Sequence, residues 1–337
     1  MSDQINQTIQ QMTAASLSER AMLVQLNTSF WTPPRIDRAL SDETAKQHGI
    51  PAHLVKTHKF LIDPKTPSYA ALLTAKGKLR NDHYRMTLPW SDDQGKPRIL
   101  PAVSFPKYAE VMRQDMASFN DCRDTFCGEW PALIQRAIAD MHGIVTLSDF
   151  PADIRGLISV RHSVTPIPSM PHDIRVNMSD HQAAALRDEM TRCLDQQIRD
   201  ALVVATREPY KRMFVHLTRM VERLNGVKQN GNASDFRPTL ITGLRDICAA
   251  LPALNVCNDP TLAEIGMACD AMVANISAEQ LASVPVIRQR VACEAAALLD
   301  RIAPQLATDQ QLSPEADAVM QQAGAAEAAM RGFQCDF

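Results

Sequence analysis

The spacing of Ser104-Phe-Pro-Lys107 is that of a Ser-x-x-Lys pair, in which a lysine can activate a serine nucleophile. The Ser-Asp-Asn and Lys-Thr-Gly elements that accompany such a pair are absent from the chain. Ser104 also stands directly before a predicted helix that has proline in its first turn, where serine is a preferred N-cap. We therefore interpret Ser104 as a helix cap and predict no nucleophile here.

Several histidines and aspartates have the chemistry of metal ligands. One series recurs at intervals of five: His48, His53, His58 and Asp63. Five residues do not place side chains on one face of a helix, and Pro51 excludes a regular helix there. Asp92 and Asp93 have the chemistry to bind a hard cation, but no further carboxylates follow at calcium-loop spacing. The sequence therefore predicts no metal site.

Motifs for nucleotides and cofactors are absent. The chain has no P-loop, dinucleotide fingerprint, nucleophile elbow or zincin helix. The glycines Gly226 and Gly231 lack the following Lys-Ser/Thr that holds phosphate. We predict no catalytic residue and no cofactor, and an enzyme is the third choice of function.

A basic ridge is the one charge pattern that points to a partner. Its members recur mainly at multiples of four along a predicted helix: Arg207, Lys211, Arg212, Arg219 and Arg223. Such a ridge can follow a phosphate backbone, dock an acidic protein, or be a solvated or internally paired face. Glu208 and Glu222 interrupt it, and no aromatic residues for base stacking are interleaved. The same ambiguity holds for a second cluster, Lys76, Lys78, Arg80 and Arg85.

Composition favours a helical protein. Helix-forming residues dominate, glycine is scarce at 12, and aromatic residues make up only 5%. Residues 1–100 hold 13 Lys/Arg and 9 Asp/Glu, whereas residues 246–337 hold 4 Lys/Arg and 12 Asp/Glu. The basic N-terminal region and the acidic C-terminal region can therefore attract each other within or between chains. The eight cysteines form no Cys-x-x-Cys pair, and neither a secretory signal nor an apolar run long enough for a membrane span is present. We expect a cytoplasmic protein.

Apolar periodicity predicts the main elements. Helices are expected over residues 3–22 and 68–87, an extended piece from Val24 to Trp31, and loops over 35–65. The strongest signal is an apolar stripe at steps of three and four: Phe105, Tyr108, Met112, Met116, Phe119, Cys122, Phe126, Trp130, Leu133, Ala137 and Met141. A second stripe covers 180–225 through Leu186, Met190, Leu194, Ile198, Leu202, Phe214, Leu217, Val221 and Leu224. Two stripes of similar length predict an antiparallel, coiled-coil-like helical hairpin.

The predicted fold class is mainly all-α. The alternating residues around Ile158–Val164 and Ile174–Met178 predict a small β-hairpin near 156–178, at the tip of the long helices. Three regions follow: helices and loops with a short extended segment over 1–100, the helical hairpin over 101–234, and an acidic bundle of shorter helices over 235–337.

The chain resembles a family of uncharacterised proteins, a domain of unknown function from bacteriophages and integrative conjugative elements. The matching features are, in order, Trp31 before a basic stretch, Leu88-Pro-Trp-Ser-Asp92, Leu100-Pro101, Trp130-Pro-Ala132 and Ile167-Pro168. They cover about residues 20–260, and the acidic C-terminal region lies outside the match.

The resemblance implies an accessory or adaptor role and assigns no catalytic activity. The resemblance also implies that the protein is found near MoxR/CobS-type AAA+ ATPases and von Willebrand A proteins, as members of the family are. We therefore expect a non-enzymatic interaction or adaptor protein of a phage or mobile element, with a protein partner of that kind and homo-oligomers as a further option. The alternative is a nucleic-acid-binding accessory factor that uses the basic ridge.

Overall fold

The computed structural model describes residues 8–91, 96–167, 180–225 and 239–306. The chain divides into two compact units, and the boundary lies within helix α6 (Asp180–Asn225). We call Met12–Ala205 the sheet unit, and Met1–Gln11 with Thr206–Phe337 the helical unit. The chain is largely helical, but it contains a four-stranded and a two-stranded antiparallel sheet. The prediction of a mainly all-α fold built on one helical hairpin is therefore wrong.

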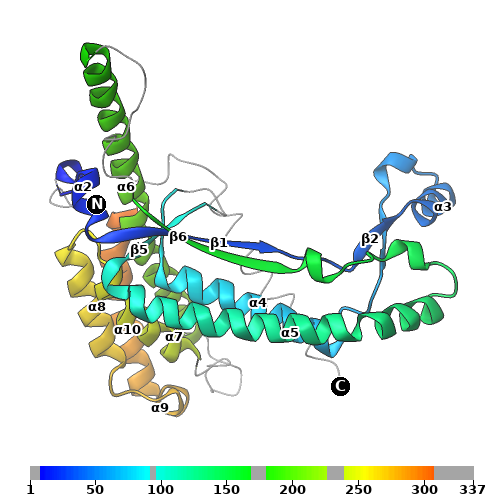
Figure 1. The fold of residues 1–337 in the computed structure, drawn as a ribbon. Helices are drawn as coiled ribbons and strands as arrows, with labels where there is room; N and C mark the ends of the chain where they lie inside the picture. Colours follow the sequence, from blue (N-terminus) through cyan, green and yellow to red (C-terminus); the bar gives the residue numbers. More distant parts are fainter. Residues whose placement is uncertain (1–7, 92–95, 168–179, 226–238, 307–337) are drawn as a thin grey trace. The chain divides into compact units, whose positions relative to one another are not determined.

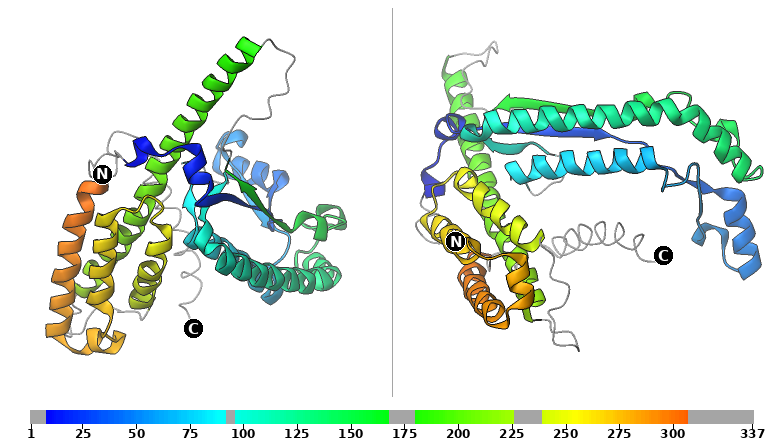
Figure 2. Two further views of the ribbon diagram at one scale, coloured as in Figure 1. Left: turned by 60° about the vertical axis from the view of Figure 1, so that its left-hand side comes forward. Right: turned by 90° about the horizontal axis from the view of Figure 1, so that it is seen from below.

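The larger sheet joins strands that are far apart in the sequence. Its order is β4-β5-β1-β6, with β4 (Leu88–Pro89), β5 (Arg98–Pro101), β1 (Ala21–Ser29) and β6 (Ser159–Pro166). Val24 of β1 lies opposite Arg98 of β5 on one side and Val164 of β6 on the other. In the views of Figure 1 and Figure 2, β1 and β6 run together as a ribbon along helices α4 and α5.

Helix α5 (Phe105–Asp140) packs against α4 (Pro67–Met86) rather than against α6. Both helices begin with proline in the first turn, where a missing N–H costs nothing. Their shared core contains side chains of α4 (Tyr69, Leu72 and Ala75) and of α5 (Phe119, Phe126, Trp130, Ile134 and Ala137). The stripe predicted along α5 is therefore a packing face, but its partner is the preceding helix.

The expected hairpin of the two long helices is not formed. Periodicity tells that a helix buries one face but does not name what covers it. In α6 the apolar stripe is not uniformly buried: Met190 is 44% exposed, whereas Leu217 and Leu224 are buried in the helical unit. The strand predicted near 158–164 is present as β6, but it pairs with β1 instead of closing a local hairpin. Its expected partner at 174–178 lies outside the described residues.

The helical unit has one core, formed by the second half of α6 and four shorter helices. These are α7 (Thr239–Leu254), α8 (Pro260–Val273), α9 (Ala278–Ser283) and α10 (Pro285–Leu306). Asp259 caps α8 by accepting bonds from the N–H groups of Thr261 and Leu262, and it also accepts from the Tyr210 hydroxyl at 2.6 Å. Shorter helices thus occupy the region in which they were predicted.

Residues 35–65 are more ordered than the proline and glycine content predicted. They form β2 (Pro34–Asp37), α3 (Arg38–His48), the 3-10 turn η1 (Ala52–Leu54) and β3 (Thr57–Phe60). Gly49 ends α3 in the left-handed conformation, at a φ of 63°, which explains why a glycine follows the helix. At the N-terminus, α2 (Ala14–Ser18) is followed by β1 from Ala21, so the helix predicted over 3–22 ends earlier than expected.

Seven cysteines are free thiols; Cys335 lies outside the described residues. Within the described ranges, no helix combines the length and apolar character that crossing a bilayer requires.

Ser104 does not cap α5, so that prediction is wrong. The 3-10 turn η2 (Ala102–Ser104) leads directly into the helix, and Ser104 itself has helical φ and ψ of −88° and −11°. An N-cap side chain reaches back to the helix N–H groups only from an extended backbone. The Ser104 side chain makes no capping hydrogen bond.

Trp130→Ala is expected to lower the free energy of unfolding by about 3–5 kcal/mol, because a large side chain would leave a cavity in the α4–α5 core. Trp130 is 5% exposed, and its ring centroid lies 5.0 Å from that of Trp31. Val103→Ala is the control, because Val103 is 81% exposed and its substitution should change the free energy of unfolding by less than about 0.5 kcal/mol. Urea unfolding of both variants would measure the two changes. Equal losses would show that the core is misassigned.

Ser104→Ala should change the free energy of unfolding by less than about 0.5 kcal/mol, because no capping bond is lost. Ser277→Ala is the matched comparison. Ser277 accepts from the Gln280 N–H at 3.1 Å and completes a capping box, so its loss should cost about 1 kcal/mol. The same unfolding measurement distinguishes them, and a larger loss at Ser104 would restore the capping interpretation.

Candidate functional site

The predicted basic ridge lies on α6, but its members differ in accessibility. Arg207, Lys211 and Arg212 are half-buried, and the Nε of Arg212 donates to Glu208 at 2.9 Å. Arg219 and Arg223, nearer the end of the helix, are exposed. The structure thus places part of the ridge in an ion pair and part at the surface. Nucleic-acid binding by this ridge stays a prediction.

The second basic cluster on α4 is occupied by neighbouring groups. Lys76 Nζ lies 4.0 Å from the centroid of the Phe30 ring, and Arg80 lies over Tyr84 at 5.3 Å. Arg85 donates to Asp82 at 2.7 Å. Lys78 pairs with Asp82 at 3.1 Å and with Asp115 of α5. These contacts stabilise α4 and its packing on α5, although Lys78, Arg80 and Arg85 are exposed. Phosphate binding by this cluster stays a prediction.

Asp115 is the most buried carboxylate of this cluster, at 4% exposed. Burial raises the pKa of Asp115, although the hydrogen bond from Lys78 opposes the increase. Asp82 lies beside it and contributes to the same cluster. The described residues contain no group of three or more potential metal ligands. Because Lys78 belongs to α4 and Asp115 to α5, the cluster makes a polar contact between the two helices.

A buried hydrogen-bonded chain links α4, α5 and β6. The Tyr108 hydroxyl lies 2.7 Å from His83 Nδ1 and 3.0 Å from His162 Nε2. One hydroxyl proton can be donated to only one imidazole, so the other imidazole must donate to the hydroxyl oxygen. Next to this chain, Arg98 donates to the Thr87 hydroxyl at 2.7 Å and to the Thr87 carbonyl at 3.0 Å.

The environment keeps this chain uncharged at neutral pH. Burial lowers the pKa of His83 from 6.5 to about 3, and the charge of Arg98 adds to the decrease. Burial also raises the pKa of Tyr108 and lowers that of His162. Neutral donors and acceptors that satisfy one another hold three elements together. The chain is therefore a structural connection between β6 and the helices.

The other residues considered as nucleophiles or metal ligands do not lie together in the described structure. Ser104 and Lys107 lie at the start of α5, where Lys107 is exposed. Three exposed histidines lie in three different elements: His48 in α3, His53 in η1 and His58 in β3. Asp63 lines a separate hollow of about 400 Å³ with Lys65, Arg136 and Asp140. Asp92 and Asp93 lie outside the described residues.

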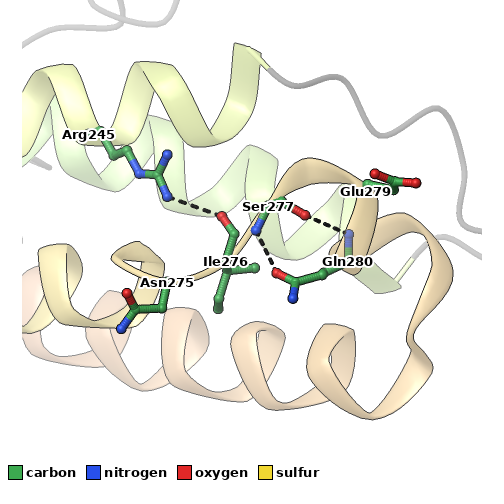
Figure 3. A pocket seen from close by; sticks show the side chains of 6 residues that line it. All are labelled: Arg245, Asn275, Ile276, Ser277, Glu279 and Gln280. Carbon is green, nitrogen blue, oxygen red and sulfur yellow. Dashed lines mark hydrogen bonds between the residues drawn. The ribbon is translucent and has the colours of Figure 1, made fainter.

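The hollow beside Arg245 is shallow, and Arg245, Ser277 and Gln280 in its lining are held by hydrogen bonds (Figure 3). It measures about 530 Å³ and is lined by Arg245, Asn275, Ile276, Ser277, Glu279 and Gln280. Arg245 donates to the carbonyls of Val273 at 2.6 Å and Ile276 at 3.1 Å. These bonds satisfy carbonyls at the end of α8, which is a capping role.

The feature that sequence reasoning missed is the two-stranded ribbon β2–β3. Pro34 lies opposite Phe60, and Ile36 lies opposite His58. Side chains opposite each other, or two apart, share one face of a ribbon. We call Pro34, Ile36, His58 and Phe60 the outer face. Ile36 is 51% exposed and Phe60 is 49% exposed.

The opposite face of the ribbon is polar and covered. The Lys59 side chain is 12% exposed and lies 3.6 Å from Asp37. Its ammonium donates to the Ile144 carbonyl at 2.9 Å and pairs with Asp149 at 3.2 Å, in the segment after α5. The Thr57 N–H donates to the Ser41 hydroxyl of α3. The ribbon therefore turns its charges inward and its apolar side chains outward.

Only a weak sequence signal for this arrangement existed. Each strand has four residues, which is too short for alternation to stand out. The inward direction of Lys59 also depends on Asp149, about 90 residues later.

Comparison with protein-family models, curated proteins and solved structures finds no match for this chain.

Acidification should destabilise the protein through His83. Below pH 6.5 the unfolded chain binds a proton at this histidine, whereas the folded chain does so only near pH 3. Above pH 6.5 neutral His83 therefore makes its full contribution to the free energy of unfolding. This contribution is lost as the pH falls toward 3, by up to about 1.4 kcal/mol per pH unit. Urea unfolding between pH 7.5 and 4 should show a shallower dependence in His83→Asn. Identical slopes would contradict the assignment.

Proposed function

We propose that this chain is a non-enzymatic interaction protein that binds a protein partner through the outer face of the β2–β3 ribbon. The observation that carries the proposal is the reversed polarity of this ribbon. Ile36 and Phe60 are about half exposed, while Lys59 on the other face is covered and paired.

The reversal matters because it runs against the usual distribution of side chains. A single exposed apolar residue on a surface is ordinary. Covering a lysine costs free energy unless its charge is paired, and here two carboxylates and a carbonyl supply the pairing. With the polar face fixed inward, Ile36 and Phe60 contact water unless another molecule covers them.

The ribbon is also held in place on the sheet unit. Trp31, three residues before β2, packs on Trp130 and Phe126 of α5, with centroid distances of 5.0 and 6.5 Å. Lys59 ties β3 to the segment after α5. A surface fixed by such contacts loses little conformational freedom when it binds, which favours recognition.

The polar groups with catalytic potential support a binding role over an enzymatic one. His83, Tyr108 and His162 bond to one another, and Lys78 is paired with Asp82 and Asp115. His83 and Tyr108 are also buried, at 2% and 0% exposed, so a substrate would not reach them in this conformation.

The partner class remains part of the proposal. The resemblance to the phage and mobile-element family makes AAA+ ATPases and von Willebrand A proteins the first candidates. We propose that the interaction takes place in the cytoplasm. The alternative nucleic-acid function rests on the exposed part of the basic ridge, Arg219 and Arg223. The paired and half-buried remainder supports it less.

Site-specific photocrosslinking in cells that express the chain naturally tests the proposal. A benzophenone amino acid in place of Phe60 should give a discrete adduct with one protein, because this side chain would lie in the interface. The same probe at Val103, which is 81% exposed but outside the ribbon, should not give that adduct.

Ile36→Asp in the same chain should remove the adduct while the melting temperature stays that of the unsubstituted protein. Adducts of equal yield at positions 60 and 103, or an adduct insensitive to Ile36→Asp, would contradict the proposed function.

A further inference from the structure

From the charges around the outer face we infer that its partner contributes an acidic segment with apolar side chains. This inference rests on the proposed function and names the chemistry of the molecule that covers the ribbon. It follows from the exposed apolar residues, from the charge of residues 34–60, and from the side of the ribbon on which these side chains lie.

The apolar part sets the first requirement. Ile36 and Phe60 lie on the outer face, and Ile50 and Leu54 are 45% and 67% exposed in the connection between the two strands. Covering these side chains is favourable in proportion to the apolar area removed from water. A partner without apolar side chains would gain nothing from them.

Local charge sets the second requirement. Residues 34–60 contain five Lys/Arg and three Asp/Glu, a balance of +2 in a chain whose net charge is −3. One of the three acidic residues, Asp37, is already paired with Lys59 on the covered face. The exposed cations of this segment are Arg38, Lys46 and Lys56, and its exposed anions are Asp42 and Glu43, which leaves an exposed balance of +1. An electropositive surface attracts acidic partners and repels basic ones.

The direction of Lys56 connects the two requirements. Along residues 56–60 exposure alternates, with Lys56, His58 and Phe60 exposed and Thr57 and Lys59 less so. Alternate residues of an extended chain point to one side, so Lys56 continues the outer face. One surface therefore presents an ammonium group, an imidazole and two apolar side chains to a partner.

An acidic protein fits this surface better than a nucleic acid does. Three of the four exposed apolar residues are aliphatic and offer no aromatic plane for stacking bases.

Fluorescence anisotropy with the full chain and three synthetic 15-residue peptides tests the inference. The first peptide combines glutamate with regularly spaced leucine and phenylalanine, the second replaces every glutamate by lysine, and the third replaces every apolar residue by serine. The first should bind about tenfold more tightly than either of the others, and its affinity should fall as salt is raised.

Two variants locate the binding, and a third serves as control. Phe60→Ser should weaken binding of the acidic peptide about tenfold. Lys56→Glu should weaken it about fivefold and strengthen binding of the lysine peptide, a reversal that unfolding would not produce. Val103→Ser should leave every affinity unchanged. Unaltered melting temperatures confirm that each variant is folded.

Several results would overturn the inference. These are tighter binding of the lysine peptide, equal losses in Phe60→Ser and Val103→Ser, and Phe60-dependent binding of a single-stranded oligonucleotide in preference to the acidic peptide. Self-association of the chain that Phe60→Ser abolishes would assign the face to a second copy. A crosslinked partner at position 60 together with failure of the acidic peptide would reject this inference and leave the proposed function standing.

Discussion

The packing of α5 against α4 is the contact on which the rest of the sheet unit depends. Trp31, Tyr69, Phe126 and Trp130 meet at its centre with ring centroids 5.0–6.5 Å apart. Aromatic side chains bury large areas and favour such tilted and edge-on arrangements. Because Trp31 lies between β1 and β2, the same cluster fixes the larger sheet on one side and the β2–β3 ribbon on the other.

Polar contacts specify the register of this assembly. The chain from His83 through Tyr108 to His162 joins two helices to β6, and Lys78 joins α4 to α5 through Asp115. Buried polar groups are costly when unpaired, so a displaced strand or helix would lose these partners. Chemistry-bearing residues in this part of the chain thus have an architectural role.

The β2–β3 ribbon also depends on ion pairing and apolar side chains, but here the paired charges lie inward and the apolar side chains lie outward. Lys59 is held inward by Asp37, Asp149 and a carbonyl, so alternation leaves Ile36 and Phe60 facing outward. Recognition by this face would then depend on apolar contact supplemented by the positive charge of residues 34–60. A surface of this kind combines affinity from burial with selection by charge.

The sequence by itself determined the local elements that have long apolar repeats. The helix predicted over 68–87 is α4, the stripe from Tyr108 to Trp130 is the buried face of α5, and the residues around Val24 and Val160 are strands. Pairing was decided only in the tertiary structure: α5 packs on α4, and β6 pairs with β1 about 130 residues earlier. Periodicity records which face of an element is apolar, whereas the identity of the covering element depends on chain path and shape. The outward face of Ile36 and Phe60 was hidden for the same reason, since the direction of a four-residue strand is set by the distant carboxylate that binds Lys59.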